Sequence, residues 1–169
     1  SRMVDDVVAE AGVSLLKTAV GQASVVARMT DEQAFVGGEG SGSAAVPAFS
    51  RGFDGFLMMA LVLEMMAVNR SSLSELVRSL PRYQMVKKSM ACESRAAYHA
   101  LEQLLTQAER FGADRLDLPD RVRLDREDGW LHVRASHTEQ LIRVLSEARV
   151  RSVAERRAEE ALRLIGQGL

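Results

Sequence analysis

Hydrophobic positions in the first third of the chain switch between helical spacing and short continuous runs. The helical spacing predicts helices over residues 3–11 and 23–29, and the short runs predict strands over residues 13–16 and 34–36. Helices that alternate with strands in this way are typical of an α/β domain with a parallel sheet. Because two strands do not form a stable sheet by themselves, we interpret residues 1–80 as part of a larger α/β domain with a mixed or parallel sheet.

A long helix is predicted over residues 54–69, where nearly every position is apolar. Asp54 suits the N-cap, because its carboxylate can accept hydrogen bonds from backbone N–H groups of the first turn. A helix that is apolar on all sides is expected to be buried on most faces. Its methionines leave open a second interpretation, a surface for a protein partner, although methionine more often fills a core. Ser72 and Glu75 then predict a capping box for a shorter helix, which ends before Pro81.

After Pro81 the pattern changes, and alternating polar and apolar positions become frequent. Asp128 and Gly129 predict a two-residue hairpin turn between two strands. We therefore expect residues 81–169 to form a small α+β domain, in which an antiparallel sheet is packed by helices. Its predicted elements are an edge strand over residues 83–87, strands over 122–125, 130–134 and 141–147, and amphipathic helices over 94–110 and 152–165.

A loop at residues 37–43 contains four glycines, two serines and the carboxylate of Glu39. Glycine lets a backbone approach a ligand closely. The carboxylate and the hydroxyl groups, including that of Ser41, can exchange hydrogen bonds with a polyol. A flexible linker is the alternative interpretation, because runs of glycine and serine are often linkers.

A second polar loop lies between two predicted strands and contains Arg134, Ser136, His137 and Thr138. A guanidinium group, hydroxyls and backbone N–H groups are the donors that hold a phosphate or a carboxylate. The alternative interpretation is a polar turn in which Arg134 forms a surface ion pair with Glu139. Spacing alone does not separate these two possibilities.

The composition narrows the classes of function. With 169 residues, 47% hydrophobic content and a net charge of −1, the chain can bury a core, and it lacks the basic footprint of a nucleic-acid-binding protein or a polybasic membrane anchor. No signal peptide is recognised at its start, and no apolar stretch is long enough to span a bilayer. The single cysteine, Cys92, cannot form an intramolecular disulfide, so we expect a cytoplasmic protein. No spacing of His, Cys or carboxylate residues suggests metal ligands.

Taken in order, these motifs resemble those of the α-D-phosphohexomutase family, the phosphomannomutases and phosphoglucomutases, over essentially the whole chain. Residues 52–55 and 73–83 are similar to the segments that follow the family's sugar-recognition loop. The loop itself, usually GGE-x-SG-H, and the phosphate-binding loop, usually RPSGTEP, are matched by Gly37-Gly38-Glu39-Gly40-Ser41-Gly42 and by Arg134-Ala135-Ser136-His137-Thr138-Glu139-Gln140.

The resemblance implies the C-terminal part of such an enzyme. Residues 1–80 would be the end of its third domain, and residues 81–169 its fourth domain, which has a fold like that of the TATA-binding protein. Family members interconvert hexose 1-phosphate and hexose 6-phosphate through a hexose 1,6-bisphosphate, with a phosphoserine in the first domain and magnesium in the second. Neither of those motifs occurs here, so this chain alone should be inactive, and its partners would be the N-terminal domains and the hexose phosphate.

The resemblance also assigns roles to residues. Glu39 and Ser41 would bind sugar hydroxyls, whereas the phosphate would be held by Arg134, Ser136, His137 and Thr138. Some positions depart from the family pattern, which leaves a non-catalytic phosphosugar-binding module of the same descent as the alternative. The departures are Gln22, Ser43, Phe53, Ala135, His137 and Gln140.

Overall fold

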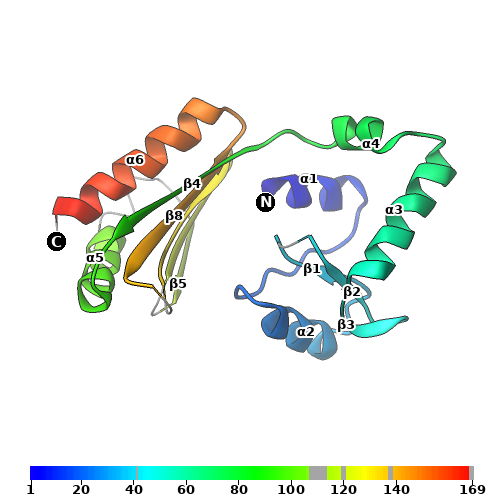
Figure 1. Ribbon diagram of the computed structural model, residues 1–169, viewed down its shortest axis with the longest axis horizontal. Helices are drawn as coiled ribbons and strands as arrows, with labels where there is room; N and C mark the ends of the chain where they lie inside the picture. Colours follow the sequence, from blue (N-terminus) through cyan, green and yellow to red (C-terminus); the bar gives the residue numbers. More distant parts are fainter. Residues whose placement is uncertain (41, 107–113, 119–120, 137–138, 168–169) are drawn as a thin grey trace. The chain divides into compact units, whose positions relative to one another are not determined.

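The computed structural model describes residues 1–40, 42–106, 114–118, 121–136 and 139–167 (Figure 1). The chain divides into two compact units. One consists of Asp5–Pro81, and the other of Ser1–Val4 together with Arg82–Leu169. Each unit is described by itself.

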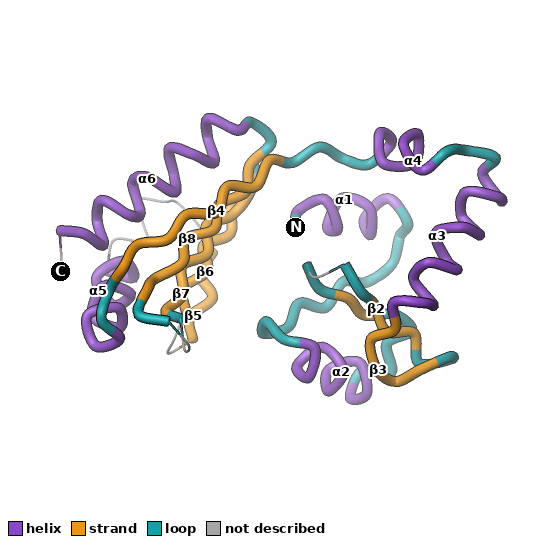
Figure 2. The backbone as a smooth tube through the Cα atoms, viewed as in Figure 1, coloured by secondary structure: helices purple, strands orange, loops and turns teal. Residues whose placement is uncertain are grey.

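The Asp5–Pro81 unit contains a small three-stranded sheet in the order β1-β2-β3, with antiparallel neighbours (Figure 2). The sheet is followed by a long and a short helix. The elements are α1 (Arg2–Glu10, which begins in the other unit), α2 (Gln22–Asp31), β1 (Gly37–Gly38), β2 (Ala44–Val46), β3 (Ser50–Asp54), α3 (Gly55–Asn69) and α4 (Leu73–Ser79).

The core of this unit is small. It consists of Val25 and Met29 from α2 and Ala45 from β2, with Ala34 and Phe53 packed at its margin. Helix α2 lies so close to the sheet that a Cβ atom added at Gly37 would meet the Met29 sulfur at 2.2 Å. A larger residue at this position would require the Met29 side chain to move.

Two of the strands predicted in this unit are wrong. Residues 13–16 form no strand, and Val13 and Leu16 are 44% and 45% exposed. Residues 34–36 also form none, because pairing begins two residues later, where Gly37 and Gly38 lie opposite Ala45 and Ala44. Among the described residues of this unit every strand pair is antiparallel, so the predicted parallel pairing is not seen there. An apolar run becomes a strand only where another strand takes up its backbone hydrogen bonds.

The predicted helix signals are confirmed. The Asp54 carboxylate accepts from the backbone N–H of Leu57 at 3.0 Å, which makes it the N-cap of α3. Ser72 and Glu75 form the capping box of α4, in which the Ser72 N–H donates to the Glu75 carboxylate at 2.8 Å. The hydrogen bonds that the Ser72 hydroxyl and the Ser72 N–H donate to this carboxylate lower the pKa of Glu75. Helix α4 ends at Ser79, before Pro81.

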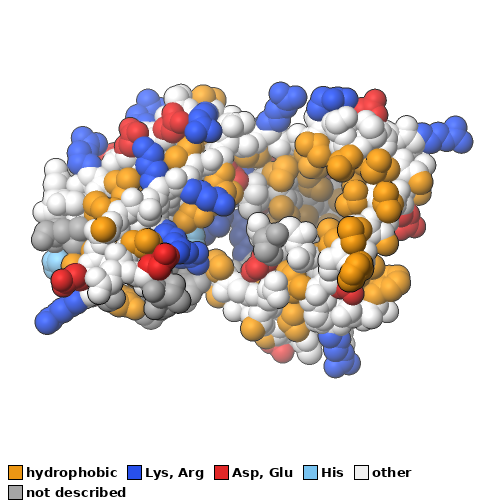
Figure 3. Space-filling model, viewed as in Figure 1, with side chains coloured by type: hydrophobic (Ala, Val, Ile, Leu, Met, Phe, Trp, Pro, Cys, Tyr) orange, Lys and Arg blue, Asp and Glu red, His pale blue; other side chains and the backbone are white. Residues whose placement is uncertain are grey.

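The predicted burial of the long helix is not observed in this chain. No residue of α3 is buried, and Phe56, Leu63 and Val68 are 82%, 64% and 75% exposed. Figure 3 shows hydrophobic side chains gathered over this part of the molecule. Among the described helices none alone is long and apolar enough to cross a membrane, although α3 and α4, bent by 86°, reach that length and composition together.

The other unit is a five-stranded antiparallel sheet in the order β4-β8-β7-β6-β5, with two helices packed on one face (Figure 1). This arrangement confirms the predicted α+β fold and places β4 at an edge, as expected. Strand β5 was not predicted, and residues 107–110 of the predicted helix lie outside the described residues. The elements are β4 (Gln84–Ala91), α5 (Ser94–Thr106), β5 (Asp114–Leu118), β6 (Arg121–Arg126), β7 (Gly129–Ala135), β8 (Leu141–Ala148) and α6 (Arg151–Gln167).

Alternation along the central strands builds the core of this unit. Val133 and Ala135 of β7, and Ile142 and Val144 of β8, are at most 4% exposed and belong to one apolar cluster with both helices. A fully buried valine or isoleucine contributes about 1.5–3 kcal/mol to stability. The intervening residues of the same strands point to the opposite face, which α5 and α6 do not cover, and Trp130, His132 and Glu147 are nevertheless buried there. From α6 the cluster takes Ala154, Ala158, Ala161 and Ile165.

The predicted hairpin turn is displaced by one residue. Gly129 pairs with Arg126, so the two loop residues are Glu127 and Asp128 rather than Asp128 and Gly129. The glycine is required for a different reason, because a Cβ atom there would lie 1.9 Å from the carbonyl oxygen of Glu147 on β8.

Candidate functional site

The predicted phosphate-binding loop begins at the end of β7. Arg134 is half-buried and lies directly opposite Arg143 of β8. Their neighbours Ala135 and Ile142 are buried in the core, so both arginines lie on the face of the sheet that the helices leave uncovered. Like charges directly opposite one another destabilise a strand pair, and an anion beside either arginine offsets this repulsion.

Backbone hydrogen bonds close the ends of the loop. Ser136 N–H donates to Leu141 O at 2.9 Å, and Leu141 N–H donates to Glu139 O at 2.8 Å. The Glu139 N–H also donates to Ser136 Oγ at 3.3 Å. A hydroxyl that accepts here still has its own hydrogen to donate, so Ser136 can serve as a donor to an anion.

Glu139 has a different partner from the one that its spacing suggested. Its carboxylate accepts from the Arg143 guanidinium, and no ion pair joins it to Arg134 in the described part of the chain. The alternative in which Arg134 is neutralised by Glu139 is therefore wrong. Arg134 lies on the sheet face without that competitor.

The predicted sugar-binding loop belongs to the other unit and is the turn of a hairpin. It joins β1 to β2, and Gly42 N–H donates to the Glu39 carbonyl at 3.2 Å. Gly42 has a φ of 92°, a conformation that glycine adopts without strain. Glu39 is half-buried directly after β1. The loop is thus a folded hairpin turn rather than a linker.

Two family models account for nearly the whole chain. The model described as "Phosphoglucomutase/phosphomannomutase, alpha/beta/alpha domain III" matches residues 1–83. The model described as "Phosphoglucomutase/phosphomannomutase, C-terminal domain" matches residues 86–164. The chain belongs to the phosphoglucomutase/phosphomannomutase family.

Curated proteins agree with this assignment. The chain is similar to "Phosphoglucomutase/phosphomannomutase" of Thermococcus kodakarensis, with 32% identity over 100% of this chain and 37% of that protein. It is also similar to "Probable phosphoglucosamine mutase" of Methanococcoides burtonii, with 34% identity over 96% of this chain and 37% of that protein. The chain therefore spans about 37% of the length of these relatives.

The fold is shared with a phosphoglucomutase/phosphomannomutase family protein of Burkholderia thailandensis, whose crystal structure aligns with a TM-score of 0.79 at 24% identity. The alignment covers 98% of this chain and 35% of that one. At this identity the likeness supports the fold alone.

In this family member the structure describes only some of the predicted site residues. It brings Arg134 and Ser136 together in one unit and places Glu39 in the other. Ser41, His137 and Thr138 lie outside the described residues. Sequence analysis places Arg143 on the strand that follows this loop but assigns it no role, although its position four residues after Glu139 was a signal for an ion pair.

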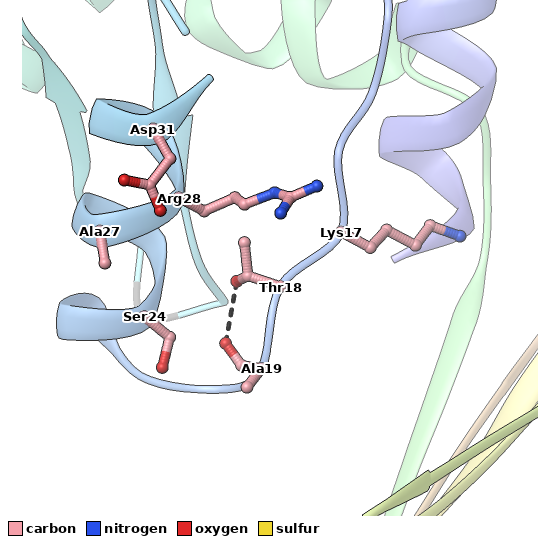
Figure 4. A pocket seen from close by; sticks show the side chains of 7 residues that line it. All are labelled: Lys17, Thr18, Ala19, Ser24, Ala27, Arg28 and Asp31. Atoms are coloured by element: carbon pink, nitrogen blue, oxygen red, sulfur yellow. Dashed lines mark hydrogen bonds between the residues drawn. The ribbon is translucent and has the colours of Figure 1, made fainter. Parts of the chain in front are cut away.

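A shallow, open pocket of about 450 Å³ lies elsewhere in the Asp5–Pro81 unit (Figure 4). Arg28 reaches from α2 toward the segment that carries Thr18. The cations at this pocket already have carboxylate partners, because Lys17 pairs with Asp5 at 2.7 Å and Arg28 pairs with Glu32 at 2.9 Å. Of the predicted site residues that the structure describes, none lines this pocket.

The resemblance implies magnesium, which proteins hold with oxygen ligands such as carboxylates. No group of three or more His, Cys, Asp or Glu side chains among the described residues could hold a metal ion. The magnesium implied by the resemblance therefore has no fitting donor set in the described part of the chain.

Proposed function

We propose that this chain is the C-terminal part of a phosphohexomutase that interconverts hexose 1-phosphate and hexose 6-phosphate. Residues 1–80 would be the end of the third domain and residues 81–169 the fourth. Magnesium, the phosphoserine and the hexose 1,6-bisphosphate chemistry would belong to the longer cytoplasmic protein. The chain's own contribution is recognition of the sugar and of the phosphate that does not react.

One observation carries the proposal. In the unit matched by the family's C-terminal domain, half-buried Arg134 lies two residues before Ser136 on the sheet face opposite α5 and α6, while Glu139 is paired with Arg143. A guanidinium can form two parallel hydrogen bonds with a phosphate, and the Ser136 hydroxyl can add a third. His137 and Thr138 are proposed to complete the phosphate site, by resemblance.

The sugar would be recognised by the other loop. Glu39 can accept hydrogen bonds from sugar hydroxyls, and Ser41 is proposed to add a hydroxyl partner. Binding of the remote phosphate also orients the substrate for transfer. A substrate that is held at both ends has few orientations available relative to the transferring group. Both loops therefore position the substrate, and neither supplies the reacting phosphoryl group.

The test compares the longer protein with this chain. The longer protein should convert glucose 1-phosphate or mannose 1-phosphate to the 6-phosphate, and the 169-residue chain alone should show no turnover. Binding of the sugar phosphate by the longer protein without turnover would instead support the non-catalytic module. Turnover that purifies with this chain alone would contradict the proposed division of roles.

Arg134→Lys in the longer protein tests the phosphate site directly. Lysine keeps the charge but loses the paired donors, and a charge-assisted hydrogen bond is worth about 1.5–3 kcal/mol. We expect kcat/KM for the sugar phosphate to fall about ten- to a hundredfold. Arg151→Lys, on α6, is the matched control and should leave kcat/KM unchanged. Equal kcat/KM values in the two variants would show that Arg134 does not bind the phosphate.

A further inference from the structure

Two arginines and one carboxylate lie at the start and end of the phosphate-binding loop. Arg134 and Arg143 are directly opposite one another on β7 and β8. Glu139, whose backbone N–H donates to the Ser136 hydroxyl, pairs with Arg143. Nothing in the family comparison assigns a role to Arg143.

The carboxylate of Glu139 is a potential competitor of the phosphate. Carboxylates and phosphates both form paired hydrogen bonds with a guanidinium group, so a free carboxylate beside Arg134 would occupy the same donors. Glu139 follows Arg134 by five residues in a loop whose ends are held together by backbone hydrogen bonds. Its charge would also repel an arriving anion.

We propose that Arg143 is a positioning residue that holds Glu139 away from Arg134 and so keeps Arg134 available for phosphate. This inference rests on the proposed function, because it assumes that Arg134 binds the phosphate. The ion pair is half-exposed, with side-chain exposures of 39% and 53%, so it adds little to folding stability. The ion pair matters instead because it keeps Glu139 paired with Arg143 rather than with Arg134.

The experiment measures binding of inorganic phosphate to the 169-residue chain at low ionic strength, where exposed charges are least screened. Amide chemical shifts of Ser136 and Glu139 report the binding. Arg143→Gln should weaken the affinity about three- to fivefold, since an exposed charge pair is worth at most about 1 kcal/mol. Arg143→Lys keeps a cation for Glu139 and should bind nearly as tightly as the original chain.

The decisive variant is the double substitution Arg143→Gln with Glu139→Gln. Removing the competitor should restore the affinity to that of Glu139→Gln alone, which should bind at least as tightly as the original chain. A role limited to loop geometry, or direct contact of Arg143 with phosphate, would leave the double variant as weak as Arg143→Gln. That result would overturn the inference.

A matched control separates this effect from a general loss of charge. Arg151 and Glu155 form an ion pair with the same four-residue spacing on α6, which packs on the other face of the sheet. Arg151→Gln, alone or with Glu155→Gln, should not change phosphate binding. If Arg143→Gln behaves like Arg151→Gln while Arg134→Lys weakens binding, only the inference about Arg143 is wrong. If the original chain shows no phosphate-dependent shift, the proposed function is wrong as well.

Discussion

At the scale of single residues, the hairpin between β6 and β7 shows how one side chain or its absence holds two elements together. Asp128 in the turn accepts two hydrogen bonds from Arg157 of α6, at 2.6 and 2.7 Å. Gly129 follows, where the backbone of β8 leaves no room for a side chain. The turn is therefore hydrogen-bonded to α6 and packs closely against β8.

Gly129→Ala should destabilise the Arg82–Leu169 unit. The added methyl group would lie 1.9 Å from the Glu147 carbonyl oxygen, so β8 would have to move. Overpacking of this kind typically lowers the free energy of unfolding by about 1–3 kcal/mol, which urea denaturation measures. Gly166→Ala is the control, because its Cβ would meet only the Met90 sulfur at 4.0 Å within a helix. A loss no larger than the control's would contradict the close approach.

The Asp128–Arg157 pair should make the free energy of unfolding depend on pH. The hydrogen bond from Arg157 lowers the pKa of Asp128 in the folded protein. Its stabilisation is therefore fully present above the unfolded pKa of about 3.9, and it is lost as the pH falls through the lowered folded value. Because the carboxylate is half-exposed, Asp128→Asn should remove at most about 1 kcal/mol at pH 7.

Urea unfolding of the original chain and of Asp128→Asn, from pH 7 downward, measures this contribution. The two free energies of unfolding should converge as the pH falls below the lowered folded pKa of Asp128, where the carboxylate is protonated in both the folded and the unfolded state. A difference that persists unchanged at that pH would have to come from packing rather than charge.

At the scale of elements, α3 combines a well-formed N-cap with an uncovered apolar surface. Its cap predicts where it starts, but Phe56, Met59, Leu63 and Val68 are all more than half exposed. Contiguous apolar patches of this kind usually mark an interface with another part of a protein or with a partner. In the longer protein that we propose, preceding residues would cover this surface.

The 169-residue chain should therefore self-associate with increasing concentration. Sedimentation velocity at about 10 and 100 µM should show a larger mean sedimentation coefficient at the higher concentration. The double substitution Leu63→Glu with Val68→Glu should abolish this increase. Arg70→Glu, which adds negative charge just beyond the helix, is the control and should leave association unchanged. A chain that stays monomeric at both concentrations would argue against an interface at α3.

At the scale of the whole molecule, the two units differ in how much core each buries. Among the described residues, the apolar cluster of the Arg82–Leu169 unit contains eighteen buried residues, and that of the Asp5–Pro81 unit contains three. Since hydrophobic burial is the main favourable term in folding, the first of these units should be the more stable one. The small sheet β1-β2-β3 adds little to the other.

Hydrogen exchange should reflect this difference. The slowest amides should lie after Pro81, in β7 and β8, which occupy the interior of the five-stranded sheet. Amides of residues 3–36 should exchange far faster, because local opening exposes little apolar surface there. Slower exchange in residues 3–36 than in β7 would show that the Asp5–Pro81 unit is the more stable one.

The sequence by itself determined those features whose cause is local. Asp54, Ser72 and Glu75 specify their caps through hydrogen bonds within one turn, and the alternation of polar and apolar residues predicted β4 and β6. The motifs at residues 37–42, 52–55, 73–83 and 134–140, taken together and in order, also indicated the family, since they depend on residue type and order.

Tertiary structure alone decided which strands pair and which charges meet. Gly37 and Gly38 became a strand because Ala44 and Ala45 lie opposite, whereas residues 13–16 have no such partner among the described residues. Glu139 lies five residues from Arg134 and four from Arg143, and the fold pairs it with Arg143. The physical reason is that backbone pairing and ion pairing depend on distances in space, which spacing along the chain only limits.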